Sequence, residues 1–137
     1  MTDLLTSYAP TVAVFGAIGS LFLIQLLIVD VVGIMSGHQP GGQVEEAHER
    51  LLFRVVRAHA NTNESVAAFI LLALFGMMLG VNPARLNACA VVYFVGRAAH
   101  MLCYYMNLKL MRSISFGVSL LGLIGMLIIG WVAWFGN

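Results

Sequence analysis

The sequence predicts an all-α membrane protein with one four-helix transmembrane domain over residues 1–137. The first observation is composition: 61% of the residues are hydrophobic and 9% are charged, with a mean hydropathy of +0.93. A soluble domain carries roughly 25% charged residues, so this chain has too few to cover a surface that faces water. The second observation is that the apolar residues gather in four stretches. Each is long enough to cross the hydrocarbon core as a helix, which takes about 20 residues.

The four expected spans lie at about residues 11–35, 54–81, 84–106 and 113–135. The pair Asn82-Pro83 predicts a turn between the second and third spans. Trp131 and Trp134 lie at the end of the fourth span, where aromatic residues are expected at a membrane interface. The first apolar stretch is longer than the core of a signal peptide, so we interpret it as a retained span.

Basic residues predict the orientation of the bundle. Arg50 and Arg54 flank the first loop, and Lys109 and Arg112 flank the third. The opposite side of the membrane has only Arg85. The excess of positive charge on cytoplasmic loops then predicts that the first and third loops are cytoplasmic and that both termini lie outside the cytoplasm.

Two of the spans carry polar residues on one face. On the second span the spacing is 4, 3, 4 and 3 residues for Arg50, Arg54, Arg57, Asn61 and Glu64. On the third span the same spacing joins Tyr93, Arg97, His100, Tyr104 and Asn107. Such spacing places each set on a single helical face. Because an ionised group in hydrocarbon costs several kcal/mol, these faces are expected to meet each other, another subunit or a water-filled cavity.

Cations outnumber anions on these two faces. Glu64 is expected to pair with Arg57 or Arg97, and the remaining guanidinium groups favour an anionic ligand. An Arg97–Glu64 pair that only fixes the helix register is the alternative interpretation. The wider set combines guanidinium, amide, carboxylate, imidazole and phenol groups near one end of the bundle. This mixture suits a small zwitterionic ligand with several carboxylates and an amine.

Other kinds of site have little support in the sequence. The histidines lack metal-ligand spacing, so no metal is expected. No glycine-rich phosphate loop occurs either. The net charge of +1 and the lack of a basic run give no reason to expect a nucleic-acid partner. Cys89 and Cys103 lie in apolar stretches, where cysteine acts as a small hydrophobic side chain.

Three motifs follow one another along the chain. The second span carries R-x-x-R-x-x-x-N-x-x-E between Arg54 and Glu64. The third carries G-R-x-x-H-x-x-x-Y between Gly96 and Tyr104, and the fourth opens with the pair Arg112-Ser113. Together the motifs resemble the family of membrane-associated proteins in eicosanoid and glutathione metabolism (MAPEG), over nearly the whole chain. A bacterial, microsomal glutathione transferase-like member is expected.

The resemblance implies a bundle that assembles in membrane lipids as a homotrimer, with glutathione as a co-substrate between neighbouring subunits near the cytoplasmic side. The residues implied to bind glutathione are Arg57, Asn61, Glu64, Arg97, His100 and Tyr104. The implied catalytic residues are Arg112 and Ser113. The chain departs from the pattern at three places. Ala60 stands where many members have a basic residue, and Phe116 where some have tyrosine. Several members also have an arginine in the first helix, where this chain offers only Asp30 or Gln25 nearby.

The implied function is a membrane-bound glutathione-dependent transferase, peroxidase or both, acting on lipophilic electrophiles. A free thiol has a pKa of about 8.5, and a guanidinium such as that of Arg112 would favour its thiolate. Ser113 would donate a hydrogen bond to the sulfur. A lipophilic small-molecule substrate would arrive from the bilayer, and the expected location is the bacterial inner membrane. Two alternatives stay open: a small four-helix transporter, and a MAPEG-like protein that binds without catalysis.

Overall fold

The computed structural model describes residues 2–136, and its elements in that range are all helices. In chain order they are α1 (Thr2–Ser7), α2 (Ala9–Met35), α3 (Leu51–Met78), α4 (Pro83–Tyr105) and α5 (Lys109–Gly136). The four long helices contain 27, 28, 23 and 28 residues. At a rise of about 1.5 Å per residue they are about 35 to 42 Å long, enough to cross a hydrocarbon core of about 30 Å. All four are also apolar enough to do so.

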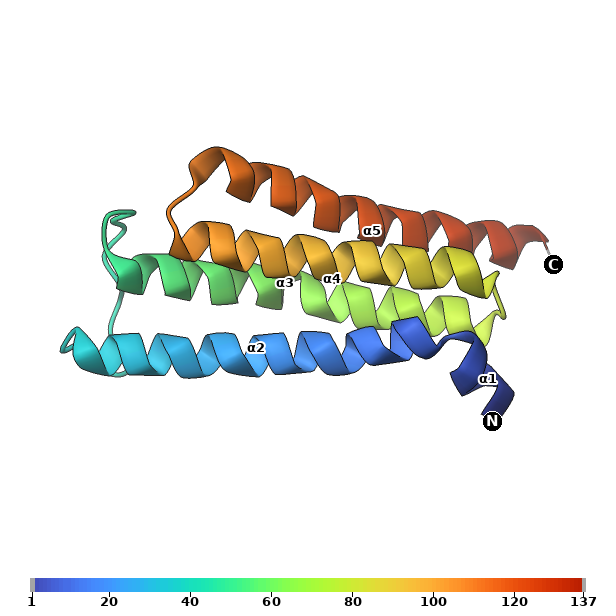
Figure 1. Cartoon of the computed structure of the whole chain (residues 1–137), viewed down its shortest axis with the longest axis horizontal. Helices are drawn as coiled ribbons and strands as arrows, with labels where there is room; N and C mark the ends of the chain where they lie inside the picture. Colours follow the sequence, from blue (N-terminus) through green and yellow to red (C-terminus); the bar gives the residue numbers. More distant parts are fainter. Residues whose placement is uncertain (1, 137) are drawn as a thin grey trace.

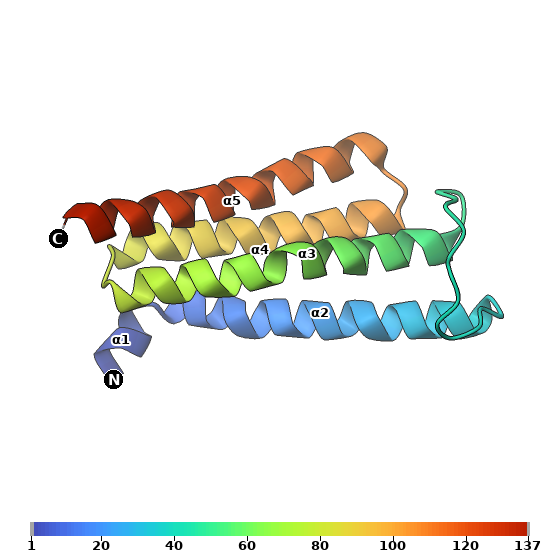
Figure 2. The same cartoon turned by 180° about the vertical axis from the view of Figure 1, so that it is seen from behind.

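The long helices lie side by side and alternate in direction, as Figures 1 and 2 show from opposite sides. Both ends of the chain lie at one end of the bundle, together with the α3–α4 turn. The longer loop between α2 and α3, residues 36–50, lies at the other end beside the α4–α5 connection. That loop end therefore carries the basic residues that flank the first and third loops.

The helix bounds differ from the expected spans in both directions: α3 and α5 begin earlier, and α3 also ends earlier than the expected residue 81. α3 begins at Leu51 rather than near 54 and ends at Met78, and α5 begins at Lys109 rather than near 113. The early starts arise because hydropathy identifies the part of a helix inside hydrocarbon, whereas backbone hydrogen bonding continues into the headgroup region. α3 ends early because Gly80 adopts a positive φ. The short helix α1 was not expected, because its sequence is neither long nor continuously apolar.

Helix ends follow recognisable local signals. Gly80 has a φ of +63° after the end of α3, and the Val81 amide donates to the Gly76 carbonyl over 3.1 Å, which closes the last turn. Asn82 then caps α4, its side chain accepting a hydrogen bond from the Arg85 amide at 3.2 Å. The predicted Asn-Pro turn is thus present, with proline in the first turn of α4.

The closest helix pair in the bundle is α4 and α5, and glycines make this possible. A Cβ at Gly96 would lie 2.5 Å from the Ser119 backbone nitrogen. A Cβ at Gly122 would lie 2.7 Å from the carbonyl oxygen of Cys89. The two backbones therefore touch where side chains would otherwise separate them, as small residues allow in membrane helices.

The N-terminal part of the chain is tied to the α3–α4 turn. The buried Tyr8 hydroxyl donates to the Val81 carbonyl. The Asn87 side-chain oxygen accepts from the Thr11 hydroxyl at 2.7 Å, and its amide donates to the Ser7 carbonyl at 3.0 Å. These bonds fix the level at which the start of α2 passes α4.

Candidate functional site

Within the predicted polar face of α3, Arg57 and Glu64 point away from the rest of the single chain, whereas Asn61 between them also contacts α4. Arg57 and Glu64 are exposed and Asn61 is half-buried. The three residues follow one another at helical spacing between the first turns of α3 and its midpoint. Polar side chains at this depth would contact lipid in an isolated chain, which is costly for charged groups.

Arg97 on α4 is the most buried charged residue of the candidate set, at 2% exposed. Its Nη1 donates to the Asn61 backbone carbonyl at 3.1 Å and also to the Asn61 side-chain oxygen. Its guanidinium carbon lies 5.7 Å from the ring centre of Tyr93 and 5.4 Å from that of Phe116. Two aromatic rings and one asparagine therefore hold the cation between α3, α4 and α5.

The expected ion pair of Glu64 with Arg57 or Arg97 is wrong for the single chain. Among residues 2–136 the structure has one ion pair, between Arg50 and Glu45. Glu64 instead accepts a hydrogen bond of 3.5 Å from the Asn61 side-chain amide. Asn61 thus stands between the buried guanidinium and the exposed carboxylate, and the direct Arg97–Glu64 register pair does not form.

A second group of candidate residues joins α4 to α5. His100 and Tyr104 are buried, at 3% and 8% exposed, and their rings meet edge to face with centres 5.0 Å apart. Arg112, in the first turn of α5, lies with its guanidinium carbon 4.4 Å from the centre of the Tyr104 ring. A cation at this distance is attracted by the ring face, so Tyr104 fixes the direction of Arg112.

Ser113 is placed less favourably. It is exposed, and its hydroxyl donates to the Lys109 carbonyl of its own helix at 3.3 Å. Of the two predicted catalytic residues, the structure brings Arg112 into contact with another candidate residue and leaves Ser113 bonded to local backbone.

One residue near the site was not singled out by the sequence, and another was named only as a departure from the family pattern. Ser65 bonds the Tyr93 hydroxyl at 2.9 Å, and Phe116 covers one side of Arg97. Ser65 breaks the spacing of the polar face, and an aromatic residue in a membrane helix usually faces lipid or core. The spacing gave no signal for Ser65, and the family pattern that marked Phe116 gave none for its contact with Arg97.

No group of three or more histidine, cysteine, aspartate or glutamate side chains between residues 2 and 136 is arranged to hold an ion. Cys89 and Cys103 are both free and half-buried.

The comparison with protein families is decisive for identity. The model of the MAPEG family matches residues 10–132, from the start of α2 almost to the end of α5. The chain belongs to the MAPEG family. This MAPEG protein is accordingly a multi-pass integral membrane protein, of a family with members in glutathione-dependent transferase and peroxidase chemistry. A search of curated proteins gives no match.

Proposed function

We propose that this MAPEG protein is a membrane-bound glutathione-dependent transferase or peroxidase for lipophilic electrophiles. The observation that carries the proposal is the contact of Arg112 with the Tyr104 ring, 4.4 Å from guanidinium carbon to ring centre. It fixes a cation at the loop end of the bundle, beside a face rich in hydrogen-bonding groups. Membership of the MAPEG family supports glutathione as the ligand that such a face would bind.

A complete site needs a second copy of the chain. Glu64 lies near the midpoint of α3 and is exposed. Arg57, two turns earlier on the same helix, is exposed as well. Covering these groups with another subunit removes the cost of exposing them to lipid. We infer a homotrimer in which Arg57, Asn61 and Glu64 of one subunit face α4 and α5 of its neighbour.

In this arrangement different residues would bind different groups of glutathione. Arg57 is free to take a glutathione carboxylate, and Glu64 is free to take the amine. Asn61 offers amide contacts to the peptide, and the buried Arg97 acts on glutathione by holding Asn61 in place. His100 and Tyr104 support Arg112 from α4.

Arg112 supplies the chemistry that the reaction needs. A thiolate is the nucleophile, and lowering a thiol pKa by two units takes about 2.7 kcal/mol of preferential stabilisation of the anion. A guanidinium and the first backbone amides of α5 both favour negative charge at this point. Ser113 would join them after its hydroxyl turns from the Lys109 carbonyl toward the sulfur.

Both reactions start from the same thiolate. In conjugation the sulfur attacks an electrophilic carbon, a carbon–sulfur bond forms, and the leaving group departs with the bonding electrons. In peroxide reduction the sulfur attacks the O–O bond of a hydroperoxide, giving a sulfenic acid and an alcohol after proton transfer. A second glutathione then reduces the sulfenic acid, forming glutathione disulfide and water.

The transporter alternative has weaker support. Asp30 is the one acidic residue of α2, and it is exposed near the end of that helix rather than deep in the bundle. The polar groups of α3 and α4 are also linked into a protein contact through Asn61.

The experiment is a steady-state comparison of Arg112→Ala with wild type, using a chlorinated arene and a lipid hydroperoxide. Loss of the cation is expected to lower turnover about tenfold or more while glutathione affinity changes less, because the other binding groups remain. Arg85→Ala is the control, since Arg85 is exposed at the opposite end of the bundle. Wild-type turnover of both substrates by Arg112→Ala would contradict the thiolate role. Tight glutathione binding by a wild-type protein that turns over neither substrate would favour the non-catalytic alternative.

A further inference from the structure

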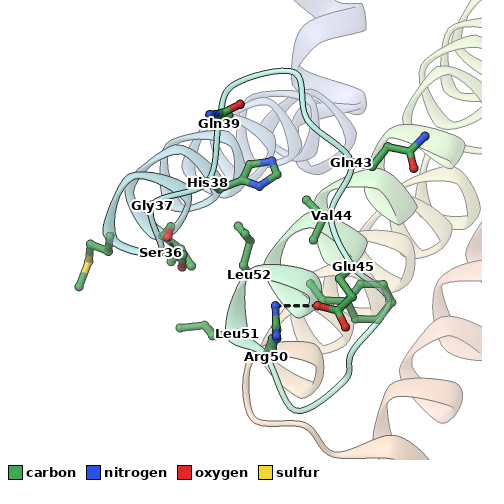
Figure 3. A pocket seen from close by; sticks show the side chains of 13 residues that line it. Ser36, Gly37, His38, Gln39, Gln43, Val44, Glu45, Arg50, Leu51 and Leu52 are labelled. Carbon is green, nitrogen blue, oxygen red and sulfur yellow. Dashed lines mark hydrogen bonds and ion pairs between the residues drawn. The ribbon is translucent and has the colours of Figure 1, made fainter.

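The loop end of the bundle contains two adjoining cavities beneath residues 36–50. The outer cavity has a volume of about 730 Å³ and the inner one about 490 Å³. Figure 3 shows the outer cavity, with the loop passing over the end of α2 and the start of α3. His38, Val44 and Leu52 line both cavities, so the two form one chamber with a polar lobe outside and an apolar lobe inside. None of its lining residues belongs to the proposed glutathione site.

The polar lobe carries one ion pair. Arg50 Nη1 lies 2.8 Å from Glu45 Oε2, and the two side chains are 66% and 69% exposed. Both residues line the lobe, and Figure 3 shows them near the start of α3, across from Ser36 and His38 near the end of α2. An exposed pair of this kind contributes at most about 1 kcal/mol, so a ligand carrying both charges can separate its members.

The apolar lobe opens toward the membrane. Apart from Asp30 and His38, apolar side chains and glycine backbone form its walls. Ile34, one of these residues, is 79% exposed on the surface of α2. Asp30 lies five residues before the end of α2 at Met35, about 8 Å along the helix. A helix of about 40 Å spans the bilayer with its headgroups, so Asp30 lies near the boundary between headgroups and acyl chains.

The walls of the chamber are held by specific contacts. The Arg54 guanidinium donates to the carbonyls of His48 and Glu49 at 2.8 and 2.9 Å, which fixes the end of the loop to α3. The His48 ring meets the Phe53 ring edge to face, with centres 4.9 Å apart. The chamber is therefore a built feature of this end of the bundle.

We propose that the chamber binds a membrane phospholipid with a zwitterionic, primary-amine headgroup. Arg50 would hold the phosphate, Glu45 the ammonium, and the apolar lobe the first part of an acyl chain. The chamber is lined by two carboxylates, of Glu45 in the polar lobe and Asp30 in the apolar lobe, and by one guanidinium, of Arg50, so it favours an added amine and disfavours a purely anionic lipid. A primary ammonium donates hydrogen bonds to carboxylates, which a choline group cannot do.

The test is native mass spectrometry of the delipidated full chain in detergent, with equal amounts of phosphatidylethanolamine, phosphatidylcholine and phosphatidylglycerol. Phosphatidylethanolamine is expected to bind about fivefold or more better than phosphatidylglycerol. Free glycerophosphoethanolamine at the same concentration should not displace it, because the chain contacts are missing. Equal binding of the three lipids, or displacement by the free headgroup, would overturn the proposal.

Matched variants separate the two lobes. Glu45→Gln should weaken phosphatidylethanolamine binding about fivefold, whereas Glu46→Gln should not, since Glu46 is exposed and lines neither lobe. Gly33→Leu should fill the apolar lobe, because a Cβ there meets only Leu52 at 4.0 Å. Its control is Gly19→Leu, at a position of α2 with nothing within 4 Å. Identical lipid binding by Glu45→Gln and Glu46→Gln would refute the headgroup assignment even if Gly33→Leu fails to fold.

Discussion

Arg97 is a buried cation, and its hydrogen-bond partner is a neutral residue. Its Nη1 bonds both the carbonyl and the side chain of Asn61, and aromatic rings lie on two sides of it. Asn61 is in turn the donor to Glu64. A substitution of Arg97 is therefore expected to affect Glu64, on the exposed face of α3, through Asn61 alone.

Removing Arg97 is expected to affect binding through Asn61. Arg97→Ala should raise KM for glutathione with a smaller effect on kcat, and should lower the free energy of unfolding by about 1–3 kcal/mol, because buried hydrogen bonds are lost. Arg97→Lys should restore stability only in part, since a point charge cannot make the same planar contacts. Steady-state kinetics and thermal unfolding in detergent measure both effects. A fall in kcat alone would show that Arg97 acts on the reacting sulfur instead.

The Tyr104 ring and its hydroxyl can be tested separately. Because the Arg112 guanidinium lies over the ring face, Tyr104→Phe should keep most of the turnover. Tyr104→Leu should lower it several-fold, since the attraction of about 0.5–2 kcal/mol that directs Arg112 is lost. If the phenylalanine variant is as impaired as the leucine variant, the hydroxyl rather than the ring is the important group.

At this scale the sequence predicted which residues share a face but not which of them touch. The 4-3-4-3 spacing correctly put Asn61 and Glu64 on one side of α3. The partner of Arg97 depends on the level at which α3 passes α4, and spacing along one helix contains no information about that level. The expected Glu64 pairing failed for this reason.

Among the elements, α4 and α5 form the closest pair, and glycine is what permits it. Gly96→Ala should destabilise the protein by about 1–3 kcal/mol, because the new Cβ would lie 2.5 Å from the Ser119 backbone nitrogen. Gly117→Ala is the control on α5, where nothing lies within 4 Å. Thermal unfolding in detergent measures the difference. Equal stability of the two variants would mean that α5 can move away from α4 without loss.

The sequence predicted the four membrane helices well, because a continuous apolar stretch of about 20 residues is typical of a helix that crosses the bilayer. It did not predict the early start of α5 or the approach of α4 to α5. Glycine is frequent throughout this chain, with 14 residues, so composition alone does not tell a packing glycine from one that faces lipid.

For the whole molecule, the exposed polar face of α3 predicts assembly. Small residues continue this face beyond Glu64, at Ala67 and Ala68, both exposed in the single chain. Native mass spectrometry in mild detergent is expected to give a species of three 14.8 kDa chains. Ala68→Leu should shift this species toward monomer, and Ala13→Leu, exposed on α2, should not. A wild-type protein that stays monomeric with intact activity would rule out a shared site.

The hydrogen bonds between the start of α2 and the α3–α4 turn have a consequence for synthesis. Tyr8 bonds a carbonyl 73 positions later, and Ser7 and Thr11 bond a side chain 80 and 76 positions later. When the first long helix leaves the ribosome and enters the bilayer, none of these partners has yet been translated. The start of α2 therefore lacks these hydrogen bonds in the membrane until α4 inserts and brings Asn87 beside it. The start of α2 is thus among the first parts of the chain to be synthesised but among the last to form its tertiary hydrogen bonds.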